Sequence, residues 1–209
     1  VSSQHYAFVV NAFVSLLKRA DMTRYELFLR ETRTYEIIED VKNFRSEIGV
    51  LFLNSYNRDV LTKMFDDNRL TYTSLFKARP HIFVSKSNPL AKHEVVSLED
   101  LEDFPYLSYD QGIHNSFYYS EEILSQIPHK KSIVVSDRAT LFNLLIGLDG
   151  YTIATGILNS NLNGDNIVSI PLDIDDEIDI VYLKHEKATL SKMGEKFLDN
   201  LVKEVTFDN

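Results

Sequence analysis

The sequence of 209 residues has no cysteine and no tryptophan, and it carries more acidic than basic side chains. Without cysteine, the chain has no disulfide bond, no thiolate metal site and no cysteine nucleophile. Lysine and arginine number 22 against 31 aspartates and glutamates, so the formal net charge is −9. Because phosphate binding needs clustered lysine and arginine, this balance argues against a nucleic-acid surface within these residues.

Long apolar runs and catalytic signatures are missing as well. No apolar stretch approaches the about 18 residues of a membrane-spanning helix, and we expect neither a membrane span nor a signal peptide. The sequence has no Gly-x-Ser-x-Gly, phosphate loop, zinc motif or dinucleotide fingerprint. Glu121 and Glu122 are adjacent on an expected helix and would face different directions, so they do not form an acid–base pair. We therefore expect no catalytic residue and no enzyme.

Metal-binding patterns are also missing. The six histidines form no pair at metal-binding spacing. Residues 173–179 have the composition of a calcium loop, but they lack its sixth-position glycine and its final glutamate. We expect a solvated acidic edge at this place, no metal and no cofactor.

Residues 132–157 predict a strand, a helix, a tight turn and a second strand. Ser136 and Asp137 can cap the helix, and Gly150 can end it because glycine takes the left-handed conformation without steric cost. Ser136 and Thr155 follow the two strands. Ligands bind beyond the carboxyl ends of the strands in an open parallel sheet, so this unit marks a candidate small-molecule site.

The rest of the chain alternates between strand and helix patterns. The expected strands are 24–30, 48–53, 70–78, 81–84, 105–109, 167–170 and 177–183, and the expected helices are 5–19, 35–45, one capped by Asn57, 97–101, 117–126 and 190–205. This alternation over the first 70 residues predicts an α/β sheet with right-handed crossovers.

Pro80 and Pro171 mark the places where the chain passes between two lobes. Proline cannot donate to a sheet ladder, so it separates one sheet from the next. We expect lobe I to contain residues 1–79 and 172–209 and lobe II to contain residues 80–171, with two crossovers between them.

The helix expected at 5–19 is apolar on two sides. A helix of this kind needs two partners. One would be its own sheet and the other a neighbouring subunit; alternatively, the whole helix is sunk in a single core. The pattern alone leaves both arrangements open.

Several stretches resemble the effector-binding domain of LysR-type transcription regulators. They are Glu47-Ile-Gly-Val-Leu-Phe-Leu, Leu75-Phe-Lys-Ala-Arg-Pro-His-Ile-Phe-Val, Asn88-Pro-Leu-Ala, Val96-Ser-Leu-Glu-Asp-Leu, and Val135-Ser-Asp with Gly150-Tyr-Thr-Ile-Ala-Thr-Gly. The resemblance covers essentially all 209 residues, and its most specific part is the Pro-Leu-Ala turn followed by the Leu-Glu-Asp-Leu helix and a strand. The resemblance implies a two-lobed type 2 periplasmic-binding-protein fold with a ligand cleft between the lobes.

The same resemblance implies a bacterial cytoplasmic regulator whose winged helix-turn-helix DNA-binding domain is absent from these residues. DNA would be contacted only through that domain, no membrane would be involved, and the protein would be a homodimer or homotetramer. The phrases Ser-Gln-His-Tyr-Ala-Phe and Ser-Asp-Arg-Ala-Thr-Leu-Phe-Asn-Leu-Leu look like the branch that controls cysteine and methionine metabolism. A small-molecule effector related to the sulfur amino acids, such as O-acetylserine or homocysteine, is therefore expected. The alternative function is a free-standing solute-binding protein of an amino-acid transporter.

The resemblance also implies which residues contact the effector. Carried over by position, they are Ser2, Ser3, Gln4, Thr32, Arg33, Thr34, Asn54, Gln111, Ser116, Ser136 and Thr155. Hydroxyls, amides and helix N-termini hold a carboxylate without a full counter-charge. Arg33 departs from the small polar residues usual in its loop, and it would either clamp a carboxylate or point to solvent.

Overall fold

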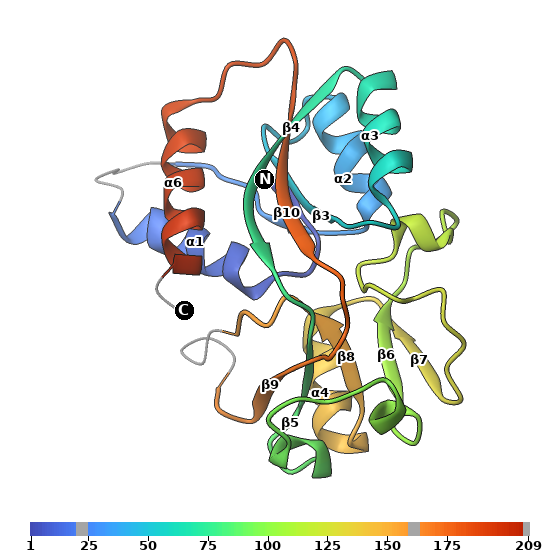
Figure 1. The fold of residues 1–209 in the computed structure, drawn as a ribbon. Helices are drawn as coiled ribbons and strands as arrows, with labels where there is room; N and C mark the ends of the chain where they lie inside the picture. The colour runs from blue at the N-terminus through green and yellow to red at the C-terminus, as the bar shows by residue number, and fades with distance from the viewer. Residues whose placement is uncertain (20–24, 159–163, 207–209) are drawn as a thin grey trace.

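Two α/β lobes, each built on a five-stranded sheet, make up the protein (Figure 1). The structure is a computed structural model that describes residues 1–19, 25–158 and 164–206. Both lobes contribute to one large hydrophobic core, which contains Phe8 and Phe52 from lobe I together with Ile82 and Tyr106 from lobe II. The two lobes therefore pack directly against each other.

Lobe I is organised around the sheet β2-β1-β3-β10-β4. Its strands are β1 (Ser2–Ser3), β2 (Arg30–Glu31), β3 (Gly49–Leu53), β4 (Leu70–Ala78) and β10 (Ile178–His185). Strand β1 lies parallel to both β2 and β3, whereas β10 is antiparallel to β3 and β4. All five residues of β3 are buried, as its continuous apolar run predicts.

Lobe II is organised around the sheet β7-β6-β8-β5-β9. Its strands are β5 (His81–Ser85), β6 (Tyr106–Tyr109), β7 (Ser132–Val135), β8 (Tyr151–Ala154) and β9 (Ile167–Pro171). Strand β6 lies parallel to β7 and β8, and β5 is antiparallel to β8 and β9. The predicted strand–helix–strand unit is present as β7, α4 (Arg138–Leu148) and β8, with the Asp137 carboxylate accepting the N–H of Thr140 as the helix cap.

The chain passes between the two sheets twice. It leaves β4 at Ala78 and enters β5 at His81, and it leaves β9 at Pro171 and re-enters lobe I in β10. Strands β4 and β10 run side by side from lobe I toward lobe II in Figure 1. The predicted fold class, a two-lobed α/β fold with two crossovers, is confirmed.

The helices of lobe I cover both faces of its sheet. They are α1 (Ala7–Arg19), α2 (Thr34–Lys42), α3 (Arg58–Asp67) and α6 (Lys192–Thr206). Helices α1 and α6 lie together on one face and α2 and α3 on the other (Figure 1). Phe13 of α1 meets Phe197 of α6 edge-to-face at 6.3 Å, while Val10 and Val14 stay half-buried. A subunit partner for this half-buried side of α1 stays a prediction.

The prediction of a helix at 117–126 is wrong. Only a 3₁₀ turn, η3 (Phe117–Tyr119), forms there, and Leu124 takes a left-handed φ of 60°. The Glu121 carboxylate accepts the backbone N–H of His5, and the Glu122 carboxylate accepts that of Tyr109. These tertiary hydrogen bonds hold both glutamate side chains in buried positions, which one solvent-facing helix turn could not do.

The prediction of a strand at 24–30 is also wrong for most of these residues. Residue 24 lies outside the described residues, 25–29 are irregular, and only Arg30 with Glu31 forms strand β2. Strand β1, its partner, has two residues, so the ladder contains only two residue pairs. A strand cannot extend where no neighbour offers backbone groups.

Helix α4 ends differently from the prediction. Asp149, not Gly150, takes the left-handed conformation, with φ at 51°. Gly150 is required for a different reason: a Cβ there would overlap Leu107 Cδ1 and lie 3.0 Å from the Pro105 carbonyl oxygen. The glycine therefore allows the turn to approach strand β6 closely.

Candidate functional site

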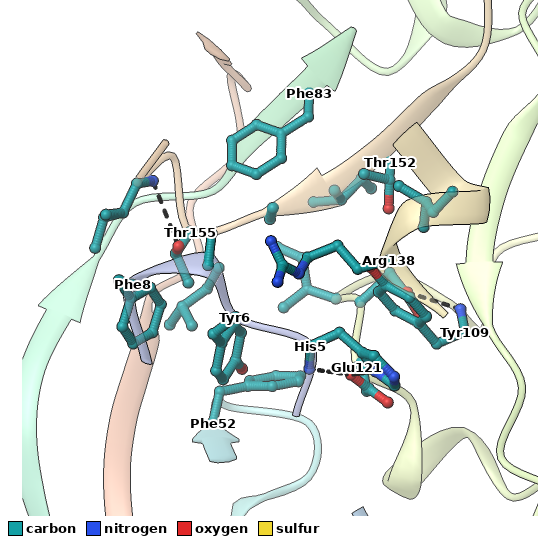
Figure 2. A pocket seen from close by; sticks show the side chains of 18 of the residues that line it. His5, Tyr6, Phe8, Phe52, Phe83, Tyr109, Glu121, Arg138, Thr152 and Thr155 are labelled. Carbon is teal, nitrogen blue, oxygen red and sulfur yellow. Dashed lines mark hydrogen bonds and ion pairs between the residues drawn. The ribbon is translucent and has the colours of Figure 1, made fainter. Parts of the chain in front are cut away.

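A pocket lies between the two lobes, next to the start of α1 (Figure 2). Lobe I contributes His5, Tyr6, Ala7, Phe8, Phe52 and Ile178, and lobe II contributes Phe83, Tyr109, Glu121, Glu122, Ile123, Arg138, Leu141, Phe142, Thr152, Ile153, Ala154, Thr155 and Ile157. Its cavity volume is about 50 Å³. At roughly 10–15 Å³ for each water, it has room for only a few water molecules. The pocket is therefore narrow as the lobes lie here.

His5 joins the lobes on one side of this pocket. Its backbone N–H donates to Glu121 Oε2 at 2.9 Å, and its ring Nδ1 contacts the same oxygen at 2.9 Å (Figure 2). The ring also stacks on Tyr109 with centroids 4.1 Å apart. Burial opposes protonation of His5, but the hydrogen bond and charge of Glu121 outweigh it and raise the pKa of His5. His5 and Glu121 thus form a polar contact that joins the segment after β1 to the loop after η3.

A chain of hydrogen-bonded amide and hydroxyl groups continues from the Glu121 carboxylate. Gln111 donates from Nε2 to Glu121 Oε1 at 3.0 Å, and its Oε1 accepts the Thr34 N–H at 3.2 Å. Gln4 donates from Nε2 to Thr34 Oγ1 at 2.7 Å, and its Oε1 accepts the Tyr6 hydroxyl at 2.6 Å. The fold therefore connects Gln4 and Thr34 of lobe I with Gln111 of lobe II.

Arg138 brings a positive charge to the pocket. It begins helix α4, and its Nε donates to Glu31 Oε1 of lobe I at 3.0 Å. The side chain lies between Thr152 and His5 in the close-up view (Figure 2). The Arg138–Glu31 ion pair thus crosses from lobe II to lobe I beside the pocket.

Arg33 neither lines the pocket nor points freely into solvent. Its guanidinium pairs with the Asp110 carboxylate of lobe II and donates from Nε to the Asp110 carbonyl oxygen at 3.2 Å. The Gly112 N–H and the Arg33 charge both lower the pKa of Asp110. Gly112 has a φ of +60°, and a Cβ there would meet the Arg33 guanidinium. This glycine therefore makes space for the interlobe pair.

Glu122 is a buried acid at the pocket wall, with 3 % of its surface exposed. Its Oε1 accepts the Tyr109 N–H at 2.9 Å, and its Oε2 has no partner among the described residues. Burial, followed by the neighbouring charge of Glu121, raises the pKa of Glu122 well above its ordinary value. The raised pKa favours the protonated form of Glu122, and a protonated carboxyl donates as well as accepts a hydrogen bond.

The residues predicted to bind an effector fall into two groups in the structure, one at or near the interlobe pocket and one away from it. Thr155 lines the pocket, where its Oγ1 accepts the Ile157 N–H at 3.4 Å. Gln4, Thr34 and Gln111 stand directly behind the pocket wall in the hydrogen-bond chain described above. Arg33 forms the interlobe pair with Asp110. Of these five residues only Thr155 lines the pocket, and a role in binding stays a prediction for all of them.

The other six predicted residues lie away from the pocket lining. Ser2 donates to Asp40 Oδ2 at 2.7 Å, Ser3 donates to the Gln4 carbonyl at 2.7 Å, and the Thr32 N–H donates to the Ser3 carbonyl at 2.8 Å. Asn54 donates from Nδ2 to Asp176 Oδ2 at 3.0 Å. Ser116 and Ser136 are exposed.

Sequence reasoning missed the charged residues of the pocket. His5 and Tyr6 directly follow the predicted loop 2–4, so extending that loop by two residues would have included them. Glu121 and Glu122 were set aside because a helix was expected there. Arg138 offered no signal except its place at the start of a capped helix.

The described residues contain no group of three or more histidines, aspartates and glutamates that could hold a metal ion. Among the same residues, none of the helices combines the length and the apolar character needed to cross a membrane.

One family model matches residues 11–206 of the chain, and its description is LysR substrate binding domain. No curated protein matches the chain significantly. The match covers nearly all of both lobes.

Solved structures with the same fold share little sequence with the chain. The effector-binding domain of QuiR in complex with shikimate is 17 % identical, with a TM-score of 0.62, 97 % of this chain covered and 94 % of that one. The reduced regulatory domain of OxyR from Pseudomonas aeruginosa is 11 % identical, with a TM-score of 0.66 and coverage of 98 % and 94 %. HinK, a LysR family transcriptional regulator from Pseudomonas aeruginosa, is 14 % identical, with a TM-score of 0.61 and coverage of 98 % and 69 %. At these identities the likeness shows the fold alone.

Proposed function

The chain belongs to the LysR substrate-binding domain family, the effector-binding domains of LysR-type transcription regulators, and from this premise we propose that its interlobe pocket senses an amino-acid-like effector. The observation that carries the proposal is the pairing of opposite charges at one small pocket. Arg138 suits a carboxylate, Glu121 suits an ammonium group, and the apolar wall suits a short side chain.

The effector class that we propose is a sulfur-amino-acid metabolite such as homocysteine or O-acetylserine. Both molecules carry an α-carboxylate and an α-ammonium group, and both have a short, weakly polar side chain. Phe52, Phe83 and Ile157 form an apolar surface for that side chain. A larger charged effector would leave part of its charge buried without a partner.

Binding would have to change the spacing between the lobes. A cavity of about 50 Å³ is too small for an amino acid while the lobes stay as they are. An effector carboxylate at Arg138 would compete with Glu31, and an effector ammonium at Glu121 would compete with His5. Because both pairs cross between the lobes, the effector would favour a different lobe arrangement, as an allosteric ligand must.

The lobe movement would be transmitted to DNA-binding domains in a cytoplasmic homodimer or homotetramer. DNA contact would come from a separate winged helix-turn-helix domain, since this part of the protein is acidic, with a net charge of −9. The half-buried side of α1 offers a surface for the second subunit.

Thermal-shift measurements and calorimetric titration test this proposal. The panel would be homocysteine, O-acetylserine, N-acetylserine, methionine, cysteine and sulfate, with unrelated amino acids as controls. A true effector at a hundred times its Kd should stabilise the protein by about 2.7 kcal/mol. Arg138→Gln should reduce this stabilisation to about half or less, whereas the matched control Arg58→Gln should retain it because Arg58 pairs with Asp179 outside the pocket. A panel without any shift would rule out the sulfur-amino-acid class, and a shift in Arg138→Gln equal to that of the wild type would rule out this pocket.

A further inference from the structure

A segment of lobe II, residues 110–120, lies against the α2 and α3 side of lobe I. It follows β6, and Figure 1 draws it in yellow-green beside α3. The residues on either side of it, Tyr109 and Glu121, both line the interlobe pocket. Whatever holds this segment in place therefore also positions part of the pocket wall. We call residues 110–120 the strap.

Aromatic rings of the strap pack against helix α2. The ring of His114 stacks on that of Tyr35 with centroids 3.5 Å apart and an angle of 13° between the planes. Tyr119 meets the same Tyr35 ring edge-to-face at 5.9 Å. Stacked and edge-to-face pairs are the two arrangements that aromatic rings prefer, so both contacts stabilise the strap on lobe I.

A second set of contacts joins the strap to helix α3. Tyr56, in the turn before α3, stacks on Tyr118 with centroids 4.8 Å apart and 16° between the planes. The Tyr119 hydroxyl donates to Met64 Sδ of α3 at 3.5 Å. The strap is thus held by two neighbouring helices of the opposite lobe.

Tyr119 also belongs to the hydrophobic core beneath these helices. That core contains Ile38, Leu61 and Phe65, and Met64 and Tyr119 pack against it at half-buried positions. Every other member of this cluster among the described residues comes from lobe I. A side chain of lobe II therefore completes a core of lobe I, and its release would expose apolar surface.

Polar contacts hold the two ends of the strap. Asp110 pairs with Arg33, but the two side chains are 40 % and 37 % exposed, so solvent screens this pair. Gln111 accepts the Thr34 N–H at 3.2 Å and donates to Glu121 Oε1 at 3.0 Å. Gln111 thereby connects the start of the strap to the glutamate that follows it.

We propose that the strap is a conformational fastening of the interlobe pocket: its aromatic contacts with α2 and α3 hold the pocket in its narrow form, and their release frees Glu121 from His5. Because Glu121 directly follows the strap, it cannot keep its place on His5 when the strap moves away from lobe I. The proposal concerns the protein by itself, and it holds for any molecule that binds between the lobes.

Native-state hydrogen exchange, followed by NMR without any ligand, tests this proposal. The His5 N–H donates to Glu121 across the lobe boundary, so its exchange reports how often that contact opens. The Ser2 N–H donates to Ile48 within lobe I and the Tyr151 N–H to Pro105 within lobe II, so these two amides report opening of each lobe.

Tyr35→Ala removes the contacts with His114 and Tyr119 and should speed exchange of the His5 amide by about threefold to tenfold. The Ser2 and Tyr151 amides should change much less. Tyr35→Phe keeps the stacked ring and should exchange as the wild type does. Tyr25→Ala, at an exposed tyrosine of the segment before β2, is the matched control and should have no effect at His5.

Tyr56→Ala tests the second stack separately. Its side chain is 38 % exposed, so this variant should fold even where Tyr35→Ala does not, and it too should speed exchange at His5. Unchanged exchange of the His5 amide in Tyr56→Ala would overturn the proposal. Acceleration by the same factor at His5, Ser2 and Tyr151 would overturn it as well, because the rings would then stabilise only the fold as a whole. Since no effector is used, this test and that of the effector class fail separately.

Discussion

His5 Nδ1 lies 2.9 Å from Glu121 Oε2, and this contact joins residues 116 positions apart across the boundary between the lobes. The His5 side chain is 6 % exposed and that of Glu121 3 %, so solvent screens the pair little. The contact stands at the wall of the interlobe pocket, where it ties the loop before α1 to lobe II. Protonation of His5 therefore strengthens one of the polar contacts between the lobes.

Stability should fall as pH rises through the raised pKa of His5. A group whose pKa is higher in the folded state stabilises the protein fully below its unfolded pKa of about 6.5 and loses that contribution above the folded value. We expect the melting temperature of the wild type to decrease between about pH 6 and pH 8, and that of His5→Gln to decrease less. Thermal unfolding in a pH series measures this. A wild-type curve parallel to that of His5→Gln would contradict the role of His5.

Substitutions of the two adjacent glutamates should act in opposite directions. Burial raises the pKa of Glu122 in the folded protein, so the unfolded chain loses this proton at a lower pH and wild-type stability declines as pH rises above the ordinary glutamate pKa. Glu122→Gln cannot ionise and so does not lose stability in this way. Its free energy of unfolding relative to that of the wild type should therefore grow by up to about 1.4 kcal/mol for each pH unit, until the folded pKa of Glu122 is reached. Glu121→Gln loses the ionic contact with His5 and should destabilise the protein. Denaturant unfolding at pH 5 and pH 7 compares them; a Glu122→Gln effect that is the same at both pH values would refute a raised pKa.

Two glycine-to-alanine substitutions test the effects of backbone strain and of helix propensity on stability separately. Gly112→Ala forces a side chain into φ +60° and against the Arg33 guanidinium, so it should cost about 1–3 kcal/mol and break the Arg33–Asp110 pair. Gly147 lies within α4 and has open space around its Cβ position, so Gly147→Ala should stabilise by about 0.5–1 kcal/mol. Chemical denaturation measures both. Equal effects from the two substitutions would show that the contact with Arg33 has no energetic consequence.

The ion pair between Arg138 and Glu31 should compete with an effector carboxylate. Glu31→Gln frees the Arg138 guanidinium from its partner in lobe I and should therefore tighten effector binding. Arg138→Gln should weaken it by at least about tenfold, which corresponds to about 1.4 kcal/mol. Calorimetric titration of both variants with homocysteine measures these changes. If Glu31→Gln weakens binding as much as Arg138→Gln does, Glu31 supports the bound state and does not compete with the ligand.

Local chemistry was enough to predict much of the framework. The buried run of β3 was evident from its apolar residues, the start of α4 from Asp137, and the two passages between sheets from Pro80 and Pro171. In each case the decisive interaction is within a few residues or is a property of the residue itself. Asp149 illustrates the limit of such rules, because it takes the left-handed position that was assigned to its glycine neighbour.

The pocket could not be predicted in the same way. Glu121 and His5 are separated by 116 residues and Arg138 and Glu31 by 107, and nothing local selects these partners. Adjacent glutamates ordinarily occur on a solvated helix, and that expectation removed Glu121 and Glu122 from the candidate site. Their burial follows from the loop after η3 facing β1, which is a consequence of packing two lobes together.

The sequence by itself determined the two-lobed α/β fold and its resemblance to the LysR effector-binding domains, because strand and helix patterns, caps and prolines act over short distances. Only the tertiary structure decided which charges meet between the lobes, that the pKa of Glu122 is raised, and that Arg33 pairs with Asp110. The physical reason is that the pKa and the partner of a side chain depend on burial and on charges brought near it by distant parts of the chain.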